Sequence, residues 1–109
     1  MIQVSDVEWS ASEKELARKV FDIAYEREVS VLIKDAREKA GAMITLDDVW
    51  QLHDFLSARR HQLDGKYDYR YSMLIFVFAQ LVKEGWLQIE ELEGLAGDKL
   101  TKIAAITRM

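Results

Sequence analysis

The side chains best suited to chemistry lie between residues 50 and 61, where indole, imidazole, carboxylate and guanidinium groups recur. On a helical wheel they share one side, because residues three and four apart in a helix are neighbours. This side, called the Trp50 face below, consists of Trp50, His53, Asp54, Ser57, Arg60 and His61. An indole is costly to leave in water, and Trp and Arg beside hydrogen-bonding groups are typical of binding hot spots. The Trp50 face therefore predicts contact with another macromolecule.

Other chemistry is open to the same residues. His53 and Asp54 could form a general acid–base pair, but no nucleophile motif or glycine-rich phosphate loop accompanies them, so we expect no enzyme. His53 and His61 lie two helical turns apart, whereas paired metal ligands on a helix favour one turn, so we expect no metal and no cofactor. Alternatively, Trp50 covers another helix or a dimer partner, and His53 and Asp54 only satisfy each other.

Composition narrows the classes of partner and compartment. The chain has 109 residues and a formal net charge of −4, so we expect one domain without general attraction to nucleic acid. The basic side chains between residues 59 and 70 are diluted by Asp64 and Asp68, which favours an acidic partner surface instead. Cysteine is absent, the longest apolar run (73–79) is too short to cross a bilayer, and residues 1–6 show no signal peptide. We therefore expect a cytoplasmic protein.

The absence of proline and the placement of five glycines predict long helices and an all-α fold. The first helix should begin with a capping box formed by Ser10 and Glu13 and should extend about 45 Å to Gly41. Further helices are expected at 45–63 and 68–84, with a cap at Thr45 and stops at Gly65 and Gly85. A short helical tail should follow, which holds residues 89–92 and then a stretch from Lys99 to about Thr107 capped by Asp98. On the side opposite the Trp50 face, the second helix should carry a core stripe of Val49, Leu52, Phe55, Leu56 and Leu63.

The apolar stripe of the first helix changes sides along its length. Leu16, Val20, Ile23 and Ala24 share one face, and a dimerisation stripe of Val29, Leu32, Ile33 and Ala36 lies roughly opposite. One small core cannot bury both faces, since a compact domain of this size has a radius of gyration of about 13 Å. We therefore expect an elongated homodimer, C2 pairing being the commonest form, with a tetramer left open. Alternatively, residues 29–33 form a β-strand, because three of the five are β-branched.

The expected organisation is a single all-helical domain over residues 1–109. Residues 1–64 would form a long-helix dimerisation region, and residues 65–109 a small C-terminal helical head.

The sequence resembles the fluorescence recovery protein family of cyanobacteria. The resemblance is carried by WQLHDFLSARRH at residues 50–61, DGKYD at 64–68 and FVFAQL at 76–81, followed by Glu84 and Gly85. It implies an all-helical protein that dimerises through its long helices. It also implies binding to the C-terminal domain of the orange carotenoid protein, a light-activated quencher of the phycobilisome antenna. The family speeds the return of this partner from its red form to its orange form and so ends quenching.

The resemblance also suggests which residues meet the partner. The functional patch of the family falls on Trp50, His53, Asp54 and Arg60, and a second region falls on Phe76 and Lys102 in the head. Phe76 lies in a very apolar helix and could equally be a core residue. Residues 1–9 depart from the family pattern. The competing interpretation is a dimeric helical module for an unrelated partner, such as a transcription co-regulator.

Overall fold

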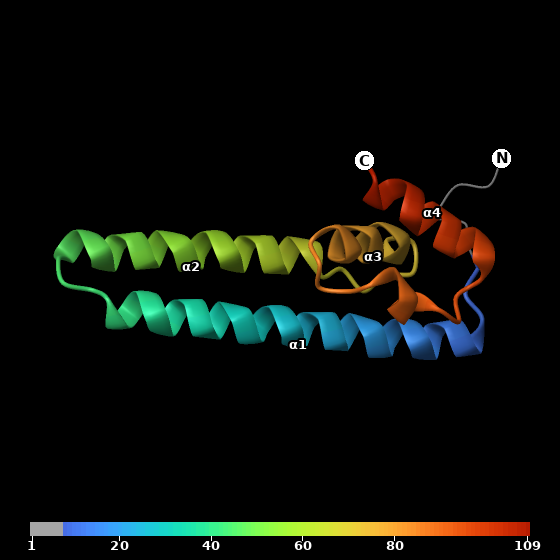
Figure 1. The fold of residues 1–109 in the computed structure, drawn as a ribbon, viewed down its shortest axis with the longest axis horizontal. Coiled ribbons are helices and arrows are strands. Elements are labelled where there is room, and N and C mark those ends of the chain that lie inside the picture. Colours follow the sequence, from blue (N-terminus) through green and yellow to red (C-terminus); the bar gives the residue numbers. More distant parts are fainter. Residues whose placement is uncertain (1–7) are drawn as a thin grey trace.

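The computed structural model describes residues 8–109, and every regular element in that range is helical. The elements are α1 (Ala11–Gly41), α2 (Leu46–Lys66), α3 (Leu74–Lys83), the short 3₁₀ helix η2 (Ile89–Leu92) and α4 (Gly97–Thr107). Figure 1 shows α1 and α2 as an antiparallel hairpin, called the arm, with α3, η2 and α4 gathered at one end as the head. The predicted all-α class is confirmed. The predictions made for residues 1–7 lie outside the described residues.

The molecule is elongated, as the overlong first helix predicted. Its principal extents are 56 × 23 × 23 Å and its radius of gyration is 16.9 Å. A compact domain of this length would have a radius of about 13 Å. The distal half of the arm therefore projects beyond the head. The pairing of two copies along the arm stays a prediction, as does the division of the chain at residue 64.

The start of α1 follows the predicted capping box. The Ser10 hydroxyl accepts the backbone N–H of Glu13, and the Glu13 carboxylate accepts the backbone N–H of Ser10. The helix then continues without interruption through residues 29–33, so the strand alternative is wrong. The β-branched residues there lower helix propensity by only a few tenths of a kcal/mol each, about 0.5 at most, which the surrounding helix overrides.

The predicted helix boundaries on both sides of residues 67–71 are wrong. The second helix continues through Gly65, whose φ is not positive, and ends only after Lys66, because Lys66 and Tyr67 are both tied to Glu28 of α1. The third helix begins at Leu74 instead of residue 68. Residues 67–71 form a strap in which the rings of Tyr67 and Tyr69 lie edge-on against Phe21 of α1. The ring centroids of Tyr69 and Phe21 are 4.9 Å apart.

The next two boundaries are the end of α3 and the start of α4. Gly85 follows α3 with φ +85°, a left-handed angle that glycine adopts without strain, so the predicted stop is confirmed. The last helix, predicted to begin after a cap at Asp98, begins two residues earlier, at Gly97. Its N-cap is Ala96, whose backbone N–H is accepted by Glu13, and Asp98 lies in the first turn instead of capping it.

The hydrophobic core occupies the head and the N-terminal half of α1. Its members come from both sides of residue 64 and include Ala17, Val20, Phe21, Ala24, Leu74, Ile75, Phe78, Leu81, Leu92 and Ile103. By contrast, α2 contains no buried residue at all. Its predicted core stripe is therefore only half covered within one chain: Leu52, Phe55 and Leu63 are half-buried, and Val49 and Leu56 are exposed.

Candidate functional site

The Trp50 face lies on the open side of the arm. The Trp50 side chain is 56% exposed, an unusual state for so large an apolar group. One turn further on, His53 Nδ1 lies 3.2 Å from Asp54 Oδ1, and both side chains are exposed. Arg60 extends into solvent with only a loose contact to Asp64, at 3.8 Å. The indole and three hydrogen-bonding groups are therefore all accessible to a second molecule.

Exposed apolar side chains continue from Trp50 over the distal arm. They are Val31, Ile33, Met43, Ile44, Leu46, Val49, Trp50 and Leu56. Val49 and Leu56 belong to the stripe opposite the Trp50 face, so these side chains lie on more than one side of the distal arm. Large exposed apolar surfaces of this kind mark interaction sites. Within the predicted dimerisation stripe, Val29, Leu32 and Ala36 are half-buried, whereas Ile33 is 47% exposed. Three residues of the stripe are therefore partly covered by the rest of the chain, and Ile33 is open to a partner.

The two remaining candidate residues lie apart from the Trp50 face, in the head. Phe76 is 44% exposed although its neighbours in α3 are buried, so the alternative that it is a core residue is wrong. Lys102 is half-buried on α4, which packs against α3. Phe76 borders a groove of about 540 Å³ whose walls come from the end of α2, including Arg59 and Lys66, and from α3.

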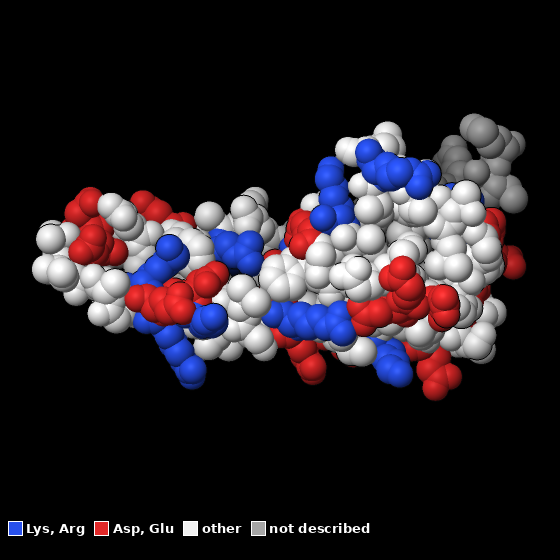
Figure 2. Space-filling view, in the orientation of Figure 1, with Lys and Arg blue, Asp and Glu red and all other residues white. Residues whose placement is uncertain are grey.

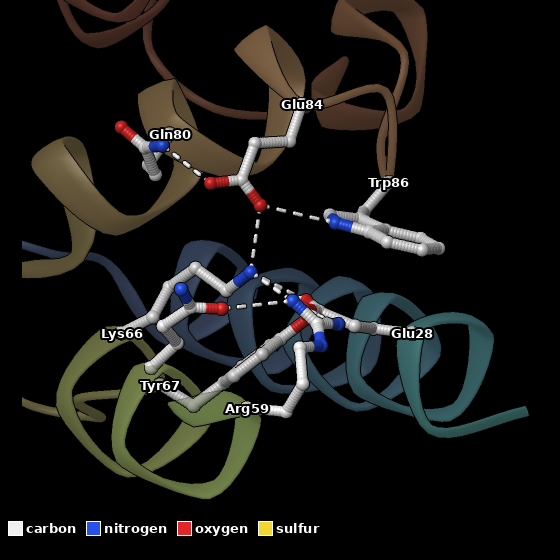
Figure 3. A network of polar contacts seen from close by, with 8 residues as sticks. Glu28, Arg59, Lys66, Tyr67, Gln80, Glu84 and Trp86 are labelled. Atoms are coloured by element: carbon white, nitrogen blue, oxygen red, sulfur yellow. Dashed lines mark hydrogen bonds and ion pairs between the residues drawn. The ribbon is translucent and has the colours of Figure 1, made fainter. Parts of the chain in front are cut away.

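A buried polar network at the base of this groove was missed in the sequence (Figure 3). The Glu28 side chain is fully buried, and its carboxylate accepts Arg59 at 3.1 Å, Lys66 at 2.8 Å and the Tyr67 hydroxyl at 2.8 Å. Lys66 also donates to Glu84 at 2.6 Å. One signal was available: Glu28 follows Ala17, Val20 and Ala24 at helical spacing and so continues their buried stripe.

The network shifts two titrating groups. Burial and the hydrogen bond to Glu28 raise the pKa of Tyr67 well above its usual value. Burial would also raise the pKa of the Glu84 carboxyl. Hydrogen bonds from Gln80 and Lys66 outweigh that effect and hold this pKa below its usual value. Tyr67 therefore stays neutral and Glu84 stays charged at neutral pH.

The charged side chains do not form one continuous field on the visible face. Figure 2 shows a few Lys and Arg side chains along the upper edge of the head and a cluster of Asp and Glu lower on it, while acidic and basic groups are interspersed along the arm. Within residues 8–109, no group of three or more His, Cys, Asp or Glu side chains is placed to hold a metal ion. No helix in the same range is long and apolar enough to span a membrane.

The chain is similar to known proteins over nearly its whole length. Residues 9–107 match the family described as "photoprotection regulator fluorescence recovery protein". A fluorescence recovery protein from Synechocystis sp. PCC 6803 is 50% identical over 109 residues, which are 100% of each chain. The solved structure of the Fremyella diplosiphon fluorescence recovery protein has a TM-score of 0.92 at 56% identity. That of the Synechocystis protein has a TM-score of 0.91 at 51% identity, and both comparisons cover 94% of this chain and 100% of the other.

Proposed function

This chain belongs to the fluorescence recovery protein family of photoprotection regulators, and from that membership we propose that it binds the orange carotenoid protein. The target is the C-terminal domain of the photoactivated, red form. Binding accelerates the return of this partner to its orange form and so restores the fluorescence of the phycobilisome. The chain makes and breaks no covalent bonds in this role, and it reaches the thylakoid surface from the cytoplasm only through its partner.

The observation that carries this proposal is the accessibility of Trp50 beside hydrogen-bonding groups. Within one chain the indole is more than half exposed, and His53 and Asp54 contact each other next to it. In this role the indole of Trp50 anchors the partner, and His53 with Asp54 fixes its orientation. Arg60, which is held only loosely by Asp64, pairs with an acidic patch of the partner.

Acceleration sets a condition on how the protein binds. A ligand that binds the red and orange forms equally shifts nothing, however tightly it binds. To speed the closure of the partner, the chain must bind the transition state of that closure more tightly than the open state. Each tenfold gain in rate requires about 1.4 kcal/mol of such preference. Holding one domain of the partner close to the other is one way to supply it.

The head supplies a second contact in this proposal. Phe76 presents an exposed ring at the edge of the groove, and the half-buried Lys102 on α4 adds a positive charge in the head. An aromatic ring and a cation suit an amphipathic surface that carries a carboxylate. The two contact regions lie on different elements, so one partner would meet both the arm and the head.

The arm also pairs with a second copy of the chain in this proposal. Support comes from α2, which buries no residue in the monomer, and from the exposed side of the dimerisation stripe at Ile33. A homodimer would cover part of the apolar surface of the distal arm. Val29, Leu32 and Ala36 would contribute their accessible edges to the same contact.

The decisive experiment follows the purified orange carotenoid protein in darkness after illumination. The absorbance change from red to orange is recorded with and without this chain. We expect a faster return that saturates as the chain is added. An unchanged rate at saturating concentration would reject the function. Capture of a different protein by the same chain would then favour the unrelated helical module.

A further inference from the structure

One ammonium group joins three helices at the junction of arm and head (Figure 3). Lys66 is the last residue of α2, and its Nζ lies 2.6 Å from a carboxylate oxygen of Glu28 on α1. The same Nζ lies 2.6 Å from Oε1 of Glu84, which directly follows α3. The Lys66 side chain is only 12% exposed. The Lys66–Glu28 pair is therefore shielded from water and salt, whereas the Lys66–Glu84 pair is partly open to solvent on the Glu84 side, which is 32% exposed.

Among the residues that the structure describes, few contacts besides ion pairs and hydrogen bonds hold α2. Its helix has no fully buried residue, and its apolar side chains Leu52, Phe55 and Leu63 are only half-buried. On the α1 side the contact is redundant, since Arg59 and Tyr67 hold the Glu28 carboxylate as well. On the α3 side, Lys66 provides the ion pair that joins α2 to Glu84.

The same lysine lines the groove between the two contact regions. Arg59, Gln62 and Lys66 of α2 form one wall of the groove, and Phe76, Val77 and Gln80 of α3 form the other. The helix that carries Arg60 and the helix that carries Phe76 are therefore the two walls. The Lys66–Glu84 ion pair joins these two walls.

We propose that Lys66 is a positioning residue: it holds the head at a fixed distance from α2, so that the contacts of Arg60 and Phe76 are presented to one partner as a rigid pair. The part that concerns the partner rests on the proposed function. When two contact regions are held rigidly, little conformational entropy is lost in fixing them relative to each other on binding. A flexible connection between them would lower the effective concentration of the second contact. Loss of Lys66 should therefore weaken partner binding without touching either contact.

The geometric part can be measured without any partner. The chain has no cysteine, so spin labels can be placed at Ala58→Cys on α2 and Ala105→Cys on α4, two exposed small residues. The doubly labelled chain is mixed with an excess of unlabelled chain, so that only distances within one protomer contribute. We expect one narrow distance distribution in the parent and a clearly broader one in Lys66→Met. An equally narrow distribution in Lys66→Met would overturn the proposal.

Three further variants separate positioning from general damage. Glu84→Ala frees only the α3 side and leaves the buried Glu28 paired, so it should broaden the distribution while the chain stays folded. Lys66→Arg keeps the positive charge and should restore the narrow distribution. Lys34→Met is the matched control, because it makes the same change at an exposed residue of α1. Within residues 8–109, Lys34 takes part in no ion pair, so Lys34→Met should leave the distance distribution unchanged.

The kinetic part uses the dark recovery of the orange carotenoid protein. We expect the half-saturating concentration of the chain to rise about tenfold in Lys66→Met and Glu84→Ala, and to stay unchanged in Lys34→Met. A broad distance distribution together with an unchanged half-saturating concentration would overturn the positioning role. If the parent chain does not accelerate recovery at all, the proposed function has failed, and the distance measurement alone decides whether Lys66 holds the head.

Discussion

Lys99 reaches the Glu13 carboxylate inside the head, with its Nζ 3.0 Å from Oε2. Both side chains are buried, and the pair joins the first turn of α1 to the first turn of α4 across 86 residues of sequence. Glu13 also accepts the backbone N–H groups of Ser10 and Ala96. One carboxylate therefore caps α1 and fixes the start of α4.

This arrangement predicts a loss of stability in acid. Burial would raise the pKa of Glu13, but the amides of Ser10 and Ala96 and the ammonium of Lys99 outweigh it and lower the pKa to about 2. Because the pKa in the folded state is lower than in the unfolded state, the stabilisation is complete above about pH 4.5 and is lost as the pH falls toward 2. We expect this group to contribute about 3 kcal/mol of the acid-induced loss.

Urea denaturation between pH 7 and pH 2 checks this prediction. Glu13→Gln should be less stable than the parent at pH 7, and the difference should shrink as the pH falls. Glu15→Gln, at an exposed position one residue from the N-terminal turn, is the matched control and should follow the parent curve. A constant difference between Glu13→Gln and the parent at every pH would contradict the assignment.

A side chain larger than that of glycine does not fit at position 94. Its φ is +115°, and a Cβ atom added there would lie 2.9 Å from Cδ2 of Leu16 on α1. Gly94→Ala should therefore destabilise the head by about 1–3 kcal/mol, through both backbone strain and the clash. Thermal unfolding measures the effect. Gly97→Ala, in the first turn of α4 with open space around the added Cβ, should be neutral or slightly stabilising.

Features with local causes could be predicted from the sequence. The capping box of Ser10 and Glu13 spans four residues, and Thr45 is a cap residue directly before α2. Both therefore predict helix starts, and both starts are where the structure has them. The Trp50 face also follows from helical spacing alone. Its accessibility was expected from the amphipathic pattern and is observed.

Features set by contacts distant in sequence could not be predicted in the same way. The strap of residues 67–71 remains non-helical because Tyr69 packs on Phe21, which is 48 positions earlier. The hydrogen bond between Tyr67 and Glu28 spans 39 positions, so neither the network nor the role of Lys66 has a local signature. For the same reason the extension of α2 beyond Gly65 was missed.

The exposed side of the dimerisation stripe predicts a charge-sensitive association. Ile33→Glu places a carboxylate where a second copy is expected to bury an apolar side chain, and an unpaired buried charge costs several kcal/mol, about 3–5 in typical cases. We expect the mass in solution to fall from dimer to monomer while the helical content is retained. Light scattering coupled to size-exclusion chromatography measures the mass. Lys34→Glu, at the adjacent exposed position, is the control for added negative charge.

The final prediction separates a partner contact at Trp50 from a contact between two copies of the chain. Trp50→Leu removes the exposed indole, and Arg60→Leu removes the cation two to three turns further along the same face. If Trp50 anchors the carotenoid protein, Trp50→Leu should keep the mass of the parent but lose at least about tenfold of its acceleration, equivalent to about 1.4 kcal/mol. Arg60→Leu should lose a similar part of the acceleration. The difference between Arg60→Leu and the parent should be larger at low salt than at high salt, because salt screens the exposed charge of Arg60. Gln51→Leu introduces the same side chain beside the Trp50 face and should behave like the parent.

Two outcomes would contradict this assignment. If Trp50→Leu is monomeric, the indole belongs to the contact between two copies of the chain. If both Trp50→Leu and Arg60→Leu accelerate recovery as the parent does, the Trp50 face takes no part in partner binding.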